Sequence, residues 1–259
     1  METTKTYIRA LITTRGELAW ADPDRVLPSW VHLSTITMVS KFEKPLNLEA
    51  LKEMFVRRKV ISIKNKGAAE KSAEWKLEDT AFHNQMTISF RNNHSIRSVK
   101  LFPNGSIQVA GCKDFIDCEY ILNQIAFLVK VILKEDNPVG PPVVSMINSN
   151  FSINSTINQR MVIQKLSADP KFKVSFNPEK YAGVIVKFVP GKGEKRVTAS
   201  VFGSGKVIVT GAKTLSEISD AYATLTSLLT KELMVKPSLT KETFGTFMGA
   251  TFEEWGKII

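Results

Sequence analysis

The sequence has few of the residues that build metal sites or disulfides. It contains two cysteines, Cys112 and Cys118, and three histidines among 259 residues. Two cysteines give no disulfide framework, and their spacing suits no common zinc site. The histidines, at positions 32, 83 and 94, are scattered and form no metal-binding motif. The sequence therefore predicts a protein without a structural disulfide, a metal ion or another cofactor.

Long apolar runs are also missing. The most apolar stretch, 120–133, is interrupted by Asn123, Gln124 and Lys130, and it is shorter than the roughly 18 residues that indicate a membrane span. The first twenty residues are polar and lack the apolar core of a signal peptide. We therefore expect a soluble, intracellular protein that does not bind a membrane.

Acidic residues are outnumbered by basic ones. The chain has 35 Lys and Arg against 25 Asp and Glu, which gives a formal net charge of +10. An excess of this size favours a polyanionic partner, most often nucleic acid. A basic surface that is only solvated would explain the charge equally well, so composition leaves both readings open.

One short stretch carries a glycine-rich signal. Residues 202–213, FGSGKVIVTGAK, contain Gly-Ser-Gly-Lys. A phosphate-binding loop needs a glycine at position 200 and a Ser or Thr after the lysine, and Ser200 and Val207 stand there instead. Alternating apolar residues on both sides of the glycines indicate a β-hairpin. Thr214 and Glu217 then match a helix capping box.

A repeat of about 100 residues is the strongest pattern in the chain. The stretch 102–113, FPNGSIQVAGCK, aligns with 202–213 and shares its Phe, its turn glycine and its Val-x-Gly-x-Lys ending. The segments 118–129 and 218–229 keep an apolar stripe of helical period at the same offset. We therefore expect two equivalent halves.

Each half is expected to follow the order strand, helix, antiparallel strands and long helix. Side by side, the halves would form one antiparallel sheet with helices on one face. The expected leading strands are 31–39 and 141–151, the short helices 46–58 and 154–166 (the second capped by Asn154), and the long helices 114–133 and 214–233. The expected domain limits are an N-terminal extension at 1–30, a first repeat at 31–138, a second repeat at 139–233, and a C-terminal extension at 234–259 that includes a short helix within 240–259.

The sheet face away from the helices is the candidate binding surface. Strand alternation places on it Ser98, Lys100, Phe102, Gln108 and Ala110 in the first half, and Thr198, Ser200, Phe202, Ile208 and Thr210 in the second. This set contains no carboxylate. Phe102 and Phe202 end their strands beside the hairpin turn, where an apolar wedge could enter between base steps from the minor groove.

The second half resembles a known family. Residues 176–188, FNPEKYAGVIVKF, and 197–218, VTASVFGSGKVIVTGAKTLSEI, are similar to the core repeat of the TATA-box-binding protein family, whose pattern runs Asn-Pro-x-x-Phe-Ala-x-Val-Ile, Phe-x-Ser-Gly-Lys and Thr-Gly-Ala-Lys. In the first half the resemblance rests on 101–113 and the repeat offset, and it extends from about residue 31 to about 233. It implies an α+β fold, a pseudo-twofold saddle of two repeats whose curved antiparallel sheet carries helices on its convex face. The divergence indicates a distant member, such as a large DNA virus would encode.

The resemblance also implies roles for single residues. Phe102 and Phe202 match the family's wedge phenylalanines, Tyr181 stands at the second repeat's other wedge position, and Met86 is the nearest apolar substitute in the first repeat. The implied groove-facing or backbone-contacting residues are Lys100, Gln108, Ala110, Ser200, Lys206, Ile208 and Thr210. Departures from the pattern are Lys100 and Gln108 at apolar positions, and an insertion at 61–79.

The function that follows is a general transcription initiation factor without catalytic activity. It would bind and bend AT-rich promoter DNA through the minor groove, and it would recruit a basal factor of the TFIIB type and the RNA polymerase machinery, in the nucleus or in a cytoplasmic viral factory. A protein–protein adaptor that has lost DNA bending is the alternative. An accessory domain of an enzyme is a third reading, although no nucleophile–base or carboxylate cluster supports it.

Overall fold

The computed structural model describes residues 2–24, 26–58, 60–63, 73–78, 84–92, 95–191, 193, 195–237, 246–247 and 250–251. The chain divides into two compact units, one of residues 34–147 and one of residues 1–33 with 148–259. Within the described residues, no helix is both long and apolar enough to cross a membrane.

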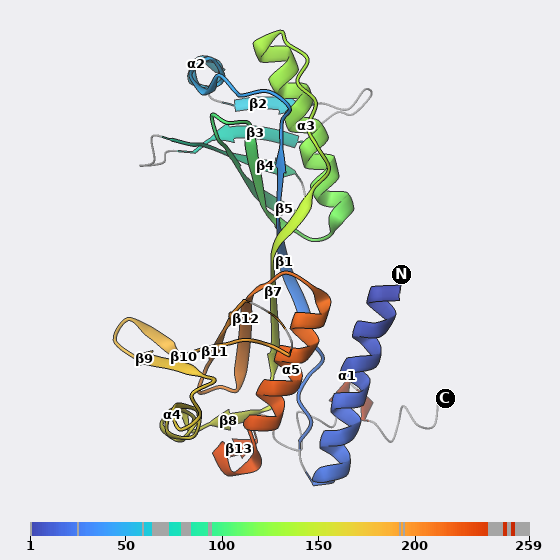
Figure 1. The fold of residues 1–259 in the computed structure, drawn as a ribbon, viewed down its shortest axis with the longest axis vertical. Helices are drawn as coiled ribbons and strands as arrows, with labels where there is room; N and C mark the ends of the chain where they lie inside the picture. The colour runs from blue at the N-terminus through green and yellow to red at the C-terminus, as the bar shows by residue number, and fades with distance from the viewer. Residues whose placement is uncertain are drawn as a thin grey trace. The chain divides into compact units, whose positions relative to one another are not determined.

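The unit 34–147 contains the first repeat. Its sheet is antiparallel with strand order β2-β3-β4-β5-β6-β1, and α2 and α3 contact each other and the same side of this sheet (Figure 1). The elements are β1 (His32–Lys41), α2 (Leu48–Arg58), β2 (Val60–Ile63), β3 (Ala73–Leu77), β4 (Met86–Asn92), β5 (Ser95–Leu101), β6 (Ser106–Cys112) and α3 (Phe115–Leu133).

The other unit contains the second repeat and the N-terminal helix. Its main sheet has strand order β7-β12-β11-β10-β9, and β13 pairs with β8 beside it. The elements are α1 (Glu2–Ala21), β7 (Val143–Ser152), β8 (Ser155–Ile157), α4 (Gln159–Ser167), β9 (Lys173–Asn177), β10 (Tyr181–Phe188), β11 (Val197–Val201), β12 (Lys206–Ala212), α5 (Leu215–Leu228), the 3-10 turn η1 (Lys231–Leu233), β13 (Met234–Pro237), β14 (Thr246–Phe247) and β15 (Ala250–Thr251).

Backbone geometry repeats along with the sequence. The turn glycines Gly105 and Gly205 have φ values of 83° and 82°, and Gly111 and Gly211 have 92° and 94°. These left-handed conformations are the reason why both halves need glycine at both places. The leading strands begin at His32 and Val143, and the first helices begin an equal distance after them. The two repeats therefore share one fold.

The long helices begin where the sequence predicts. Thr214 and Glu217 form a complete capping box, and the Asp114 side chain accepts a hydrogen bond from the Asp117 backbone N–H at 2.8 Å. Two other boundaries were wrong: α5 ends at Leu228 and not at 233, and α4 begins later than predicted. Asn158, not Asn154, caps α4, because Asn154 adopts a left-handed conformation with φ of 58° and so ends the preceding strand.

The cores confirm the predicted strand alternation. In both units the apolar side of the sheet packs against the long helix, and the opposite side stays partly exposed. The buried strand residues include Val99, Leu101, Ile107 and Val109 in the first repeat and Ala199, Val201, Val207 and Val209 in the second, and the helices contribute Ile121, Ile125, Ile218 and Leu225.

The structure adds detail to the two predicted extensions and to the predicted insertion. The N-terminal extension is largely the helix α1, which packs along α5 (Figure 1). The predicted insertion 61–79 contains β3, which pairs with β4, and Trp75 of β3 is buried against Phe90 at 4.7 Å between ring centroids. The predicted C-terminal helix lies mostly outside the described residues, and its two described segments pair as the short strands β14 and β15.

Candidate nucleic-acid interface

The open face of the second repeat is made by the strands β9 to β12. Thr198 lies opposite Thr210, and Ser200 lies opposite Ile208. All of these side chains are partly exposed, whereas their neighbours along each strand are buried. The predicted groove-facing residues of this repeat thus share one accessible face, continuous with Ile185 of β10, which pairs with Ser200.

An aromatic pair stands at the end of this face. Tyr181 and Phe202 meet edge to face, with 5.6 Å between ring centroids, and Tyr181 is 41% exposed. Gly183 lies beneath them, where an added Cβ would stand 2.9 Å from Cε1 of Tyr181 and 3.2 Å from Cε1 of Phe202. The glycine therefore gives the rings the space in which they pack.

The backbone under the aromatic pair is fixed by hydrogen bonds. The Gln159 amide, at the start of α4, donates to the carbonyl oxygens of Ala182 at 2.8 Å and Val201 at 3.1 Å. These bonds join the ends of β10 and β11. The Gln159 side chain therefore connects the two strand ends that carry the wedge candidates Tyr181 and Phe202.

Each hairpin turn is anchored to the rest of its unit. The Phe202 N–H bonds to the Lys206 carbonyl, and the Gly205 carbonyl accepts from Ile153 N–H at 2.8 Å. In the first repeat, the Phe102 N–H bonds to the Ser106 carbonyl and the Gly105 carbonyl accepts from Phe42 N–H at 2.9 Å. Phe102, half-buried, is therefore presented by the same anchored turn as Phe202.

Exposed lysines surround the second-repeat face. Lys173 and Lys187 lie directly opposite each other on β9 and β10, and Lys206 follows the turn. Like charges across a strand pair destabilise the sheet, so an anion between these ammonium groups would relieve the repulsion. The described residues of β9 to β12 include no carboxylate. Sequence reasoning missed Lys173, Lys187 and Ile185, although the alternation of 181–188 places Ile185 and Lys187 on the face of Tyr181.

The first-repeat face has a different charge. Lys100 lies between Thr87 and Gln108, and Ser98 lies opposite Ala110, so Lys100, Gln108 and Ala110 occupy the predicted face. The expectation of a face without acids is wrong for this repeat. Ser89 donates a hydrogen bond to Glu78 at 2.6 Å on that face. The acid was missed because its segment was taken for an insertion.

Met86 is the second correction. The side chain is buried and its residue pairs with Leu101, on the helix side of the sheet. In the second repeat the residue that pairs with the equivalent Val201 is Val184, also buried. Met86 therefore corresponds to Val184 and not to Tyr181. By this register, Tyr181 corresponds to position 83, which lies outside the described residues.

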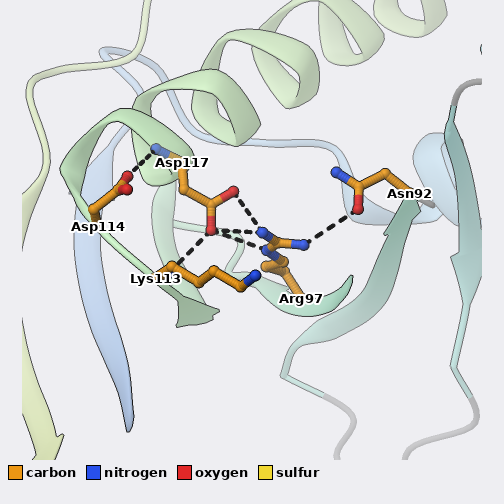
Figure 2. Close-up of polar contacts among 5 residues, drawn as sticks. All are labelled: Asn92, Arg97, Lys113, Asp114 and Asp117. Atoms are coloured by element: carbon orange, nitrogen blue, oxygen red, sulfur yellow. Dashed lines mark hydrogen bonds and ion pairs between the residues drawn. The ribbon is translucent and has the colours of Figure 1, made fainter. Parts of the chain in front are cut away.

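A buried ion pair lies beneath the first-repeat sheet. Figure 2 shows the Arg97 guanidinium on the Asp117 carboxylate, with Nη2 to Oδ1 at 2.8 Å and Nε to Oδ2 at 3.0 Å. Asp117 also accepts from the Lys113 backbone N–H at 3.0 Å, as Glu217 accepts from Lys213 in the second repeat. Val197 stands at the position equivalent to Arg97 and is buried, so this ion pair is not repeated among the described residues of the second repeat.

The two cysteines lie in the same core. Cys112 and Cys118 are buried and form no disulfide. A hydrogen bond to Cys118 and burial both raise the pKa of the Cys112 thiol, so this thiol stays protonated near neutral pH. Among the described residues, no group of three or more His, Cys, Asp or Glu side chains is placed to hold a metal ion.

Comparisons with known proteins agree with this geometry. A family model described as "Transcription factor TFIID (or TATA-binding protein, TBP)" matches residues 145–232. A "TATA-box-binding protein-like" protein of Acanthamoeba polyphaga mimivirus is 23% identical over 78% of this chain. The chain is therefore similar to the TATA-box-binding protein family, most clearly over its second repeat. The likeness to a mimivirus protein also supports the viral origin expected from the sequence.

Further relatives within the TATA-box-binding protein family lie in the archaea. The protein of Aeropyrum pernix is 29% identical over 48% of this chain. The solved structure of "Methanococcus jannaschii TBP" superposes with a TM-score of 0.52, at 15% identity, and covers 78% of this chain and 98% of that one. This likeness confirms the predicted α+β fold of two repeats. The chain spans 65% of the length of the mimivirus relative and 57% of the Aeropyrum protein.

The family match covers the second repeat and not the first. Residues 145–232 include Tyr181, Ser200, Phe202, Lys206, Ile208 and Thr210. For Phe102, Lys100, Gln108 and Ala110, the assignment rests on the internal repeat. The departures from the family pattern are therefore concentrated in the repeat that also carries Glu78 and the buried Arg97.

Proposed function

We propose that this chain is a transcription initiation factor that binds promoter DNA through the minor groove and bends it, without catalytic activity of its own. The open faces of the two repeats would lie against the groove, and the aromatic residues at the hairpin turns would enter between base steps. The family that the second repeat resembles is itself a standard example of this mode of binding.

The observation that carries the proposal is the second-repeat face. It combines an exposed aromatic pair, a row of small polar and aliphatic side chains, and lysines without a carboxylate among the described residues. Apolar wedges offset the cost of unstacking, and lysines neutralise phosphates and release counterions. Lys173 and Lys187 face each other. Binding of a polyanion next to both ammonium groups would therefore be more favourable than leaving both in water.

The two repeats would contribute unequally. Tyr181 and Phe202 give the second repeat two wedge candidates, whereas Met86 is buried and leaves Phe102 alone among the described residues of the first. Glu78 also places a carboxylate on the first-repeat face. We therefore expect the sharper kink at the second repeat.

The helices and turns away from the open faces would receive protein partners. We propose a basal factor of the TFIIB type, followed by the RNA polymerase machinery, in the nucleus or in a cytoplasmic viral factory. Lys231 and Glu232, predicted on the second long helix, lie in the turn η1 and are exposed. Charge reversal at both positions is expected to reduce partner recruitment and to spare DNA binding.

Fluorescence energy transfer across an end-labelled AT-rich duplex tests the bend. We expect Phe202→Ala to reduce bending most, Phe102→Ala to reduce it less, and Met86→Ala to change it only through loss of stability. Trp20→Ala is the matched control, because Trp20 is 90% exposed on α1. Full bending by Phe202→Ala would contradict the wedge role.

Competition experiments test the groove. A drug that binds the minor groove of AT-rich DNA should displace the protein, since flexible AT-rich steps cost less to deform. The adaptor reading is favoured by one observation, the carboxylate of Glu78 on the first-repeat face. It predicts that the chain binds protein partners while its affinity for AT-rich and GC-rich duplexes stays equal.

A further inference from the structure

The exposed side of α3 carries a line of apolar side chains. Ile116 is 78% exposed, Phe127 is 67% exposed, and Tyr120 and Val131 are about half exposed. Their spacing of four, seven and four residues places them on one side of a helix. The other side of α3 packs on α2 and β6. We call these four residues the α3 stripe.

The second repeat shows that the fold does not need apolar residues at these positions. The equivalents of Ile116, Tyr120 and Phe127, 100 residues later on α5, are polar: Ser216, Asp220 and Ser227. Val131 has no equivalent on α5, which ends at Leu228. Tyr120 also packs on Phe90, with 5.9 Å between ring centroids. Because both repeats share one fold, the exposed apolar side chains of Ile116 and Phe127 need a different explanation. Contiguous exposed apolar side chains on a soluble protein indicate an interaction surface.

The spacing of the α3 stripe is symmetric, and this symmetry fits a second copy of the same helix. Its spacing reads the same in both directions, so a second α3 running antiparallel would place Ile116 opposite Val131, and Tyr120 opposite Phe127. Asn123 is exposed, lies within the stripe, and would come next to the twofold axis. A self-complementary patch is what a twofold interface between identical chains requires.

The charges beside the stripe fit the same arrangement. Glu119 and Lys130 are exposed on one flank of α3, and Lys130 also lies 3.2 Å from Asp136 at the surface. In an antiparallel pair, Glu119 of each copy would face Lys130 of the other. A single Asn in an apolar helix interface fixes register and orientation. Asn123 would have this role in the antiparallel pair.

We propose that α3 is a self-association surface on which two copies of this chain pair their α3 helices antiparallel. The four side chains expose on the order of 500 Å² per copy, about 1,000 Å² for the pair, which is the low end of specific interfaces. We therefore expect a weak dimer with a dissociation constant in the micromolar range.

Sedimentation equilibrium of the full chain, from about 1 to 100 μM, tests the proposal. We expect the apparent mass to rise toward that of a dimer. Phe127→Ser, which installs the residue of the second repeat, should weaken the dimer about a hundredfold, because each copy loses a buried ring. Trp20→Ser is the matched control and should leave the dimer unchanged. A chain that stays monomeric, or a dimer that Phe127→Ser does not weaken, overturns the proposal.

Cross-linking tests the antiparallel geometry. Under oxidation by a copper–phenanthroline complex, Asn123→Cys should form a disulfide with its own copy across the axis. Ile116→Cys should not, because the two copies of residue 116 would lie about 22 Å apart along the helices. Cys112 and Cys118 are buried, and the parent chain measures their background. Equal cross-linking of both variants would overturn the antiparallel arrangement.

The dimer and the DNA complex use separate surfaces of the unit 34–147. Ile116, Phe127 and Val131 are more than half exposed on α3, and Tyr120 also meets Phe90 on the helix side of the sheet. Lys100 and Gln108 lie on the opposite, open side of that sheet. Phe127→Ser should therefore bind AT-rich DNA as the parent chain does. Failure of the parent chain to bind DNA would refute the proposed function and leave the dimer standing.

Discussion

The buried pair of Arg97 and Asp117 gives the sharpest test of how the first repeat is built. The residue Arg97 is 4% exposed, and its guanidinium makes a two-pronged contact with the carboxylate (Figure 2). Asp117→Asn keeps the shape and removes the negative charge. The guanidinium is then buried without a counter-charge, beside the neutral amide left at position 117 and the amide of Asn92, whose Oδ1 lies at 3.4 Å.

The expected magnitudes differ between the two partners. Removing one member of a buried pair costs about 3–5 kcal/mol because the other charge is stranded. Arg97→Met should cost less, about 1 kcal/mol, because the carboxylate that it leaves behind is partly exposed to solvent and is not stranded. Asp117 would then keep the Lys113 backbone N–H, and its side chain is 15% exposed to solvent.

The internal repeat supplies a third variant. Arg97→Val with Asp117→Glu reproduces the pair Val197 and Glu217, which the second repeat uses at the same positions. We expect this double variant to be more stable than Asp117→Asn alone, although the smaller Val leaves some unfilled space.

Urea unfolding measures the free energies, and hydrogen exchange of the α3 amides assigns the loss to the first repeat, because the chain has two units. Asp114→Asn is the matched control, since it makes the same chemical change three residues away and Asn caps helices as well as Asp does. If Asp117→Asn unfolds at the same urea concentration as Arg97→Met, the stranded-charge reasoning is refuted.

Four further predictions follow from single contacts. Burial, with a smaller contribution from Glu217, raises the pKa of Asp220, so the folded chain holds this proton more tightly than the unfolded chain does. Its contribution to stability falls as pH rises from about 4, and Asp220→Asn should flatten that part of the unfolding profile. Gly205→Ala should abolish the second hairpin geometry, because the added Cβ would lie 2.0 Å from a carbonyl oxygen at positive φ, and loss of amide protection around residue 205 would report it. Gly183→Ala should displace the aromatic pair and reduce bending in the energy-transfer assay while leaving the melting temperature within a few degrees. Lys100→Ala should lower DNA affinity and reduce the slope of log K against log salt by about 1; an unchanged slope would show that Lys100 contacts no phosphate.

The α+β fold, the repeat and the open faces could be read from the sequence because they depend on local periodicity. Alternation along 197–201 and 206–210 separates two faces of a strand, and the helical stripe at 218–229 identifies the side that must be covered. The capping box at Thr214 and the turn glycines at 105 and 205 are equally local. Each of these features was predicted at its observed position.

Tertiary structure alone decided what depends on pairing between distant segments. Met86 was assigned to the DNA face because it is apolar and near the right place, but register with Leu101 turns it into the core, and a shift of one residue moves a side chain to the other face. Glu78 reaches the open face only because β3 joins the sheet.

The helix α1 and the buried position of Arg97 also depend on contacts between distant segments. The sequence of α1 is polar, and the helix is stabilised by its packing along α5, since most helical stability in proteins comes from such packing. Arg97 and Val99 lie on the same side of β5, so the alternation predicts that both are buried. A single buried charge would be unfavourable there. Only the folded chain brings Asp117, twenty residues later, within 2.8 Å of it. The sequence by itself determined which side of each segment is apolar. The tertiary structure decided which segments meet on that side, because strand register and helix packing depend on contacts between residues far apart in the chain.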